Sequence, residues 1–159
     1  MKFHRWASPG FIGLAVVLLF FPFLGRPSSL GSPAGSPDQK RAAIAKDFVS
    51  RALRTWQDRL DLEDWRIRVN LVHPNALEPQ TLGNVHWDLG AKQATISVLS
   101  SDDYTLPTPA MLDDMEVTIV HELVHIHLSA LPRNSNSTIN EEHAVVELTQ
   151  ALLKLAKHS

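Results

Sequence analysis

The 159-residue chain contains no cysteine. This absence excludes disulfide bonds, thiolate zinc sites, cysteine nucleophiles and lipid attachment through cysteine. Any metal site must therefore use histidine, aspartate or glutamate side chains. The chain also lacks a strong net charge, which is −2 at pH 7, so its composition gives no reason to expect a nucleic-acid partner.

A hydrophobic run long enough to cross a membrane comfortably is missing as well. The longest run, residues 11–24, is shorter than the roughly 20 residues of a transmembrane helix. It follows a short basic lead and precedes a tract rich in Pro, Gly and Ser, as in a secretory signal peptide. We therefore predict that residues 1–35 are a signal peptide, cleaved after Ala34, or an uncleaved signal anchor, plus a flexible linker. The remaining chain is then secreted or periplasmic, or tethered to a membrane outside the cytoplasm.

A helical pattern begins directly after this segment. Ser36 and Gln39 stand three residues apart with Pro37 between them, which resembles a capping box at the start of a helix. Apolar residues then recur at helical spacing as far as Leu60. We therefore predict an N-terminal helix that extends from the capping box to Leu60.

A small sheet and two further helices are expected next. Polar and apolar residues alternate in short runs typical of strands, and Gly90 separates the second run from the third as in a hairpin. The predicted strands are residues 65–72, 84–89 and 93–99, and the predicted helices are residues 108–131 and 138–157. This order predicts an α+β fold in which helices pack against one face of a three-stranded sheet.

The second predicted helix carries its polar groups on a single line. At 100° per residue, its aliphatic side chains fall on two separate faces. The remaining stripe contains Asp114, Thr118, His121, Glu122 and His125. We expect such a helix inside the domain, with its polar stripe facing a cleft.

His121, Glu122 and His125 form the motif H-E-x-x-H. Histidines four residues apart lie about one turn apart on a helix, so their imidazoles can bind one ion. In this motif the histidines are zinc ligands, and the glutamate is the general base that takes a proton from zinc-bound water. We therefore predict a zinc site with His121 and His125 as ligands and Glu122 as the catalytic base. His127 falls at the edge of an apolar face and is expected to be a packed or rim residue.

Catalytic zinc usually has a third protein ligand, which must come from another segment. Glu141 falls at the middle of the apolar face of the last predicted helix, and Glu142 lies about 100° away. We favour Glu141 as the third ligand and keep Glu142 as the alternative, with His143 as a weaker choice. Both glutamates could instead serve only to stabilise the first turn of that helix.

Some other polar residues are candidates for auxiliary roles. Asp114 and Thr118 share the polar stripe and could orient the ligating imidazoles. Four residues could polarise a substrate carbonyl, although each is more typical of a structural or surface position: His73, His86, Tyr104 and Arg133.

The segments "VTIVHELVHIHL" and "EEHAVVELTQALL" make the chain resemble minimal HExxH zinc metallopeptidases of the gluzincin type, such as the ImmA/IrrE-like and phage-type groups. The resemblance implies a zincin-like domain over residues 36–159. It implies zinc held by His121, His125 and a glutamate of the last helix, with Glu122 as base. It also implies that a strand of the sheet binds extended peptide by main-chain pairing. The expected function is that of an exported zinc-dependent peptidase acting on peptides or proteins.

Two alternative functions stay open. The first is a non-catalytic binding module that zinc stabilises by clamping two helices together. A glutamate adjacent to the ligands argues against it, because structural zinc sites usually exclude water. The second is a metal-dependent hydrolase of non-peptide amides or esters, whose metal chemistry would require the same motif.

Overall fold

The computed structural model describes residues 36–131 and 137–158, and the predicted segment at residues 1–35 lies outside them. In the described part, three α-helices accompany a three-stranded mixed sheet, so the predicted α+β class is confirmed. No helix in this part is long and apolar enough to cross a membrane. The elements in chain order are α1 (Pro37–Arg59), β1 (Arg66–Val72), β2 (Gly83–Asp88), β3 (Gln93–Leu99), α2 (Thr108–His127) and α3 (Ser137–Ala156).

Helix α1 begins at the predicted capping box. The Ser36 side chain accepts a hydrogen bond from the Gln39 backbone N–H, and the Gln39 side chain accepts one from the Ser36 backbone N–H. These bonds satisfy donors that a helix start otherwise leaves without partners. The helix ends at Arg59, one residue before the predicted end, and buries Val49 and Trp56 on the side that faces the core.

Arg41 ties α1 to the segment that leads into α2. Its guanidinium donates hydrogen bonds to the carbonyl oxygens of Ser101 at 3.3 Å, Tyr104 at 3.3 Å and Leu106 at 2.9 Å. These carbonyls belong to the connection between β3 and α2, where no strand pairing supplies donors, although the Ser101 carbonyl also accepts from the Tyr104 backbone N–H. The contact holds the start of α2 against α1.

Replacing Arg41 by alanine is expected to lower the free energy of unfolding by about 1–3 kcal/mol, because three carbonyls lose a charged donor. Denaturant unfolding measures this loss. Arg51→Ala is the matched control, since Arg51 lies on the same helix and forms an exposed ion pair with Asp47. Such a pair contributes about 0.3–0.5 kcal/mol. Equal losses in the two variants would contradict the role assigned to Arg41.

The sheet has the strand order β1-β3-β2. Strands β2 and β3 pair antiparallel, with Gly83 opposite Val98 and Asp88 opposite Gln93, which confirms the predicted hairpin. Strand β1 pairs in parallel with β3, with Arg66 opposite Gln93. Strand β2 is therefore an edge strand, and among the described strands its outer edge has no neighbour.

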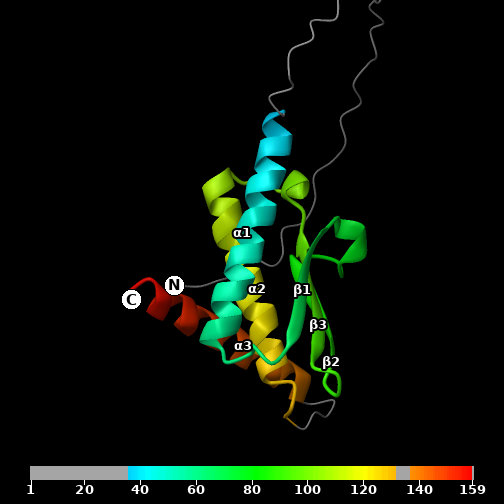
Figure 1. Ribbon diagram of the computed structural model, residues 1–159, viewed down its shortest axis with the longest axis vertical. Coiled ribbons are helices and arrows are strands. Elements are labelled where there is room, and N and C mark those ends of the chain that lie inside the picture. The colour runs from blue at the N-terminus through cyan, green and yellow to red at the C-terminus, as the bar shows by residue number, and fades with distance from the viewer. Residues whose placement is uncertain (1–35, 132–136, 159) are drawn as a thin grey trace, which may run out of the picture.

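The core lies between the sheet and the helices (Figure 1). The first predicted apolar face of α2 is buried at Ile119, Leu123 and Ile126, each at most 1% exposed. The second is buried only in part: Val120 and Val124 are at most 3% exposed, but Val117 is 44% and Leu131 59% exposed. Helix α3 contacts α2 and crosses it at a steep angle (Figure 1). The polar stripe of α2 thus runs between the two apolar faces, where side chains from α3 and β2 can reach it.

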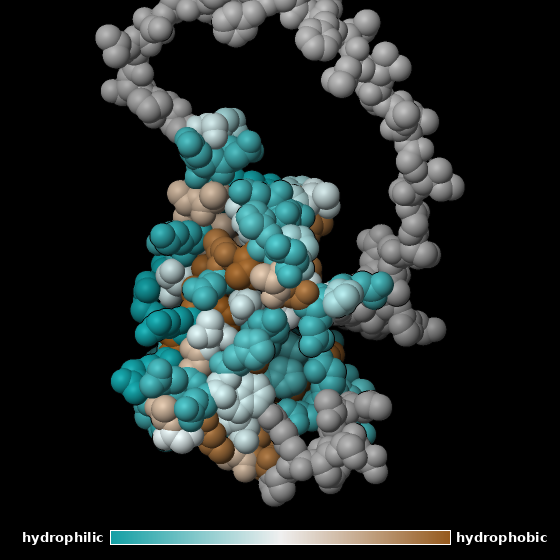
Figure 2. All heavy atoms as spheres, turned by 90° about the vertical axis from the view of Figure 1, so that its right-hand side faces the viewer, coloured by the Kyte–Doolittle hydropathy of each residue, from teal (hydrophilic) through white to brown (hydrophobic). Residues whose placement is uncertain are grey.

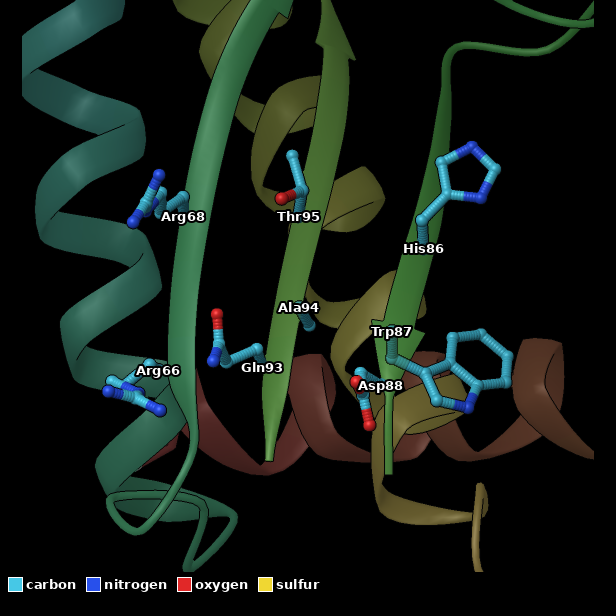
Figure 3. Close-up of a pocket in the computed structure, with 8 residues that line it drawn as sticks. All are labelled: Arg66, Arg68, His86, Trp87, Asp88, Gln93, Ala94 and Thr95. Atoms are coloured by element: carbon cyan, nitrogen blue, oxygen red, sulfur yellow. The ribbon is translucent and has the colours of Figure 1, made fainter. Parts of the chain in front are cut away.

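The face of the sheet that points away from α2 and α3 is mostly polar (Figure 3). Figure 3 shows α2 and α3 behind the sheet and mostly polar side chains in front of it. These side chains line a hollow of about 320 Å³. Viewed from the sheet side, the described domain shows many hydrophilic residues (Figure 2). The polar residues that line the hollow are Arg66, Arg68, His86, Asp88, Gln93 and Thr95.

Candidate metal centre

Helix α2 brings His121 and His125 together as the spacing predicts. Their Nε2 atoms lie 3.2 Å apart, and the ring centroids are 4.9 Å apart in an edge-to-face arrangement. The two side chains are 19% and 17% exposed, respectively. The imidazoles therefore converge on one point that solvent can still reach.

Helix α3 adds a carboxylate to this point. Glu142 places Oε1 at 3.2 Å from His121 Nε2 and Oε2 at 3.3 Å from His125 Nε2. One ligand atom from each of the three residues can be chosen so that all lie within 4.8 Å of one another. A carboxylate only accepts hydrogen bonds, and a neutral imidazole has one lone-pair nitrogen. The cluster therefore needs a proton or a cation to hold these atoms together.

The spacing of the two imidazole nitrogens fits zinc, and the Glu142 carboxylate lies within reach of the same point. A tetrahedral zinc ion with bonds of about 2.0–2.1 Å separates neighbouring ligand atoms by about 3.3–3.4 Å. The two Nε2 atoms lie 3.2 Å apart, and each lies 3.2–3.3 Å from a different oxygen of the Glu142 carboxylate, so that one donor atom from each residue falls within 4.8 Å of the others. The Glu142 side chain is 54% exposed, so the cluster is open on this side to a water or a substrate atom. An open fourth position is typical of catalytic rather than structural zinc.

Glu141 lies against the other side of His125. Its Oε1 is 3.3 Å from His125 Nδ1, whereas the cluster contains His125 Nε2. The Glu141 side chain is only 18% exposed, so it does point toward the interior, as its helical phase indicates. The contacts thus place Glu142, the alternative drawn from the sequence, and not Glu141, beside the two Nε2 atoms, and the identity of the third ligand stays a prediction. The reason is that α3 crosses α2, which brings the flank of α3 to the two Nε2 atoms.

Glu122 is 6% exposed and lies next to the edge strand. A Cβ atom placed on Gly83 would be 3.3 Å from Glu122 Oε1. Burial raises the pKa of the Glu122 carboxyl, and the charges of His121 and His125 oppose this shift in part. A carboxyl with a raised pKa takes up a proton more readily near neutral pH, as a general base requires.

The charged groups of the cluster shift one another's pKa values. Hydrogen bonds with His121 and His125 hold the pKa of Glu142 well below its usual range, although burial opposes them. Burial lowers the pKa of His125, but hydrogen bonds to Glu142 and Glu141 and the charge of Glu122 outweigh it, and the net shift is upward. When a carboxylate pairs with an imidazolium, the pKa of the acid falls and that of the base rises, as is the case for Glu142 and His125. The protonation of each of these acids and imidazoles therefore depends on the charges of the others.

The two other polar residues of the stripe have partners other than the imidazoles. Thr118 donates a hydrogen bond to the backbone carbonyl of Asp114 at 3.0 Å. The Asp114 carboxyl lies beside Tyr104, whose pKa is raised by burial and by the charge of Asp114. Within the described residues, neither Asp114 nor Thr118 is hydrogen-bonded to His121 or His125.

The remaining candidates also lie apart from the cluster. His73 pairs with Asp103 at 2.7 Å. His86 points from the outer face of the sheet (Figure 3), opposite to the face that α2 covers. His127 and His143 are exposed, and Arg133 lies outside the described residues.

Sequence reasoning missed the role of Gly83. A Cβ atom there would overlap with Thr118 Cγ2 and lie 2.9 Å from the Ser97 carbonyl oxygen. The absent side chain lets β2 pass directly over α2 beside Glu122. Gly83 directly precedes the run predicted as a strand and is the first residue of β2, and a glycine in a strand can mark such a close approach.

The chain matches no family model, no curated protein and no solved structure. Its function is therefore inferred from the positions of four side chains, those of His121, Glu122, His125 and Glu142.

Proposed function

We propose that residues 36–159 form a zincin-like domain of the gluzincin type that acts as a zinc-dependent peptidase. In this proposal His121, His125 and Glu142 hold the zinc ion, and Glu122 is the general base. The observation that carries the proposal is the convergence of the two Nε2 atoms, 3.2 Å apart, with the Glu142 carboxylate, whose two oxygens lie 3.2 and 3.3 Å from them. It is supported by the buried carboxyl that follows His121 in the chain and is coupled to both imidazoles.

The chain's own residues have distinct tasks in the reaction. Zinc, when bound, supplies Lewis acidity toward the substrate carbonyl and lowers the pKa of a bound water. Glu122 would accept a proton from an attacking water and then donate it to the amine that leaves. The raised pKa of Glu122 favours both steps, because the group must hold the proton briefly and release it again.

Among the described strands β2 lies at one edge of the sheet, and this position supports a peptide as the substrate. An edge strand presents backbone N–H and C=O groups that an extended peptide can pair with. The contact at Gly83 places this strand beside Glu122. A peptide added to β2 would therefore run past the catalytic glutamate, and we propose peptides or proteins as substrates.

The proposed location is outside the cytoplasm. Residues 1–35 resemble an export signal followed by a linker. The domain would be secreted or periplasmic if the signal is cleaved, or membrane-anchored if it is retained.

The proposal predicts that the purified protein binds one zinc ion and cleaves members of a broad peptide library. A chelator should stop cleavage, and added zinc should restore it. His121→Ala should lose both zinc and cleavage, because one of three ligands is gone. His127→Ala is the matched control and should keep both, since His127 is an exposed histidine of the same helix.

Three results would contradict the proposal or favour another function. Stoichiometric zinc without cleavage of any substrate would favour a binding module in which the ion clamps α2 to α3. Cleavage of esters or non-peptide amides alone would favour the broader hydrolase class. A wild-type protein that binds no zinc would contradict the proposed metal centre.

A further inference from the structure

His125 has a polar partner at each ring nitrogen. Nε2 lies 3.2 Å from His121 Nε2 and 3.3 Å from Glu142 Oε2, inside the cluster. Nδ1 lies 3.3 Å from Glu141 Oε1, on the other side of the ring. Because a carboxylate can only accept, Nδ1 carries the proton and donates it to Glu141. Nε2 faces the Glu142 carboxylate, so a metal ion has to displace any proton from Nε2. With Nδ1–H held by Glu141, the neutral imidazole then directs the Nε2 lone pair into the cluster, which is the form that binds a metal ion.

His121 differs from His125 in the contacts of its ring nitrogens. Its Nε2 contacts His125 and Glu142, but in the described part of the chain its Nδ1 has no hydrogen-bond partner. The two histidines of the motif are thus held differently. His125 is oriented by a side chain of another helix, whereas His121 depends on the packing of α2 itself.

Glu141 and Glu142 are adjacent in the chain but lie in different environments. The Glu142 side chain is 54% exposed at the open side of the cluster, and the Glu141 side chain is 18% exposed. A carboxylate with so little exposure requires a hydrogen-bond donor, and His125 provides one. Consecutive residues of one helix therefore contact the two opposite nitrogens of one imidazole.

We propose that Glu141 is a positioning residue that fixes the tautomer and the ring orientation of His125 for metal binding. The inference rests on the proposed metal centre, and it assigns the neighbouring glutamates separate tasks. Glu142 is a ligand and Glu141 orients a ligand. Partners of this kind raise metal affinity by about 10- to 100-fold in other metal sites.

The test compares zinc affinity, measured by chelator competition, among single variants of the full chain. Glu141→Ala should weaken zinc binding about 10- to 100-fold, and Glu141→Gln should recover part of that loss because its side-chain oxygen still accepts from Nδ1. Glu142→Ala should weaken zinc binding more than either, because it removes a ligand. Glu147→Ala is the control and should bind like wild type, since Glu147 is an exposed acid of the same helix.

The visible spectrum of the cobalt-substituted protein separates the two roles. It should change shape in Glu142→Ala, where the ligand set changes, and stay close to wild type in Glu141→Ala at saturating cobalt. The reverse pattern would make Glu141 the ligand and overturn the inference. Wild-type affinity in Glu141→Ala, or a loss of metal-free thermal stability without a change in affinity, would also overturn it. A wild-type protein without zinc affinity would instead refute the metal centre itself, and the inference with it.

Discussion

Replacing Glu122 by glutamine is expected to lower kcat/KM for peptide cleavage by about 10²–10⁴-fold, the contribution typical of a general base. Glutamine has the same shape but accepts no proton, so the reacting water loses its base. Zinc content should stay at the wild-type level, because the three donor residues are unchanged. Turnover of a fluorogenic peptide from the library and metal analysis of the same sample measure both quantities.

Asp113→Asn is the matched control for this substitution. Asp113 is an exposed acid of α2, and its change to an amide should leave cleavage at the wild-type rate. The melting temperature of Glu122→Gln should not fall, since burial already disfavours the charged form of Glu122. Wild-type activity in Glu122→Gln would refute the catalytic assignment, even in a protein that binds zinc.

Replacing Gly83 by alanine is expected to lower the free energy of unfolding by about 1–3 kcal/mol, the usual effect of overpacking. The added methyl group would overlap with Thr118 Cγ2 and lie 2.9 Å from the Ser97 carbonyl oxygen. Strand β2 must then move away from α2, and with it the backbone beside Glu122. Thermal or denaturant unfolding measures the loss, and the rate of peptide cleavage should fall as well.

Two further variants test the cause of that loss. Gly90→Ala is the control, because its Cβ would meet only Asp88 Oδ1 at 3.4 Å, an ordinary contact. Its stability should stay within about 0.5 kcal/mol of wild type. Adding Thr118→Ser to Gly83→Ala removes Cγ2 and should restore part of the stability, since the Ser97 carbonyl remains close. Equal losses at Gly83 and Gly90 would show that steric overlap with α2 is not the cause.

Much of the local structure could be predicted from the sequence, because local rules govern it. Ser36 and Gln39 marked the start of α1, since a capping box needs only residues three apart. Gly90 marked the β2–β3 hairpin, since a short connection between alternating runs leaves few other pairings. The contact of His121 with His125 follows from helix geometry alone, because both residues lie on one helix.

The choice between Glu141 and Glu142 shows where prediction from the sequence ends. Helical phase indicated that Glu141 points inward, and its side chain is indeed mostly buried. Helical phase, however, describes the direction of side chains on one helix only. Which glutamate reaches the two Nε2 atoms depends on the rotation of α3 about its own axis and on the angle at which α3 crosses α2. Packing across a connection of several residues sets that crossing, and no periodic pattern in the sequence records it.

The sequence by itself determined the α+β class, the helices and strands, and the motif that places His121, Glu122 and His125 on one stripe of a buried helix. Only the tertiary structure decided that Glu142 faces the two Nε2 atoms, that Glu141 contacts Nδ1 of His125, and that β2 passes beside Glu122. The physical reason is that spacing along one element follows from backbone geometry. Contacts between elements follow instead from how complete side chains pack in three dimensions.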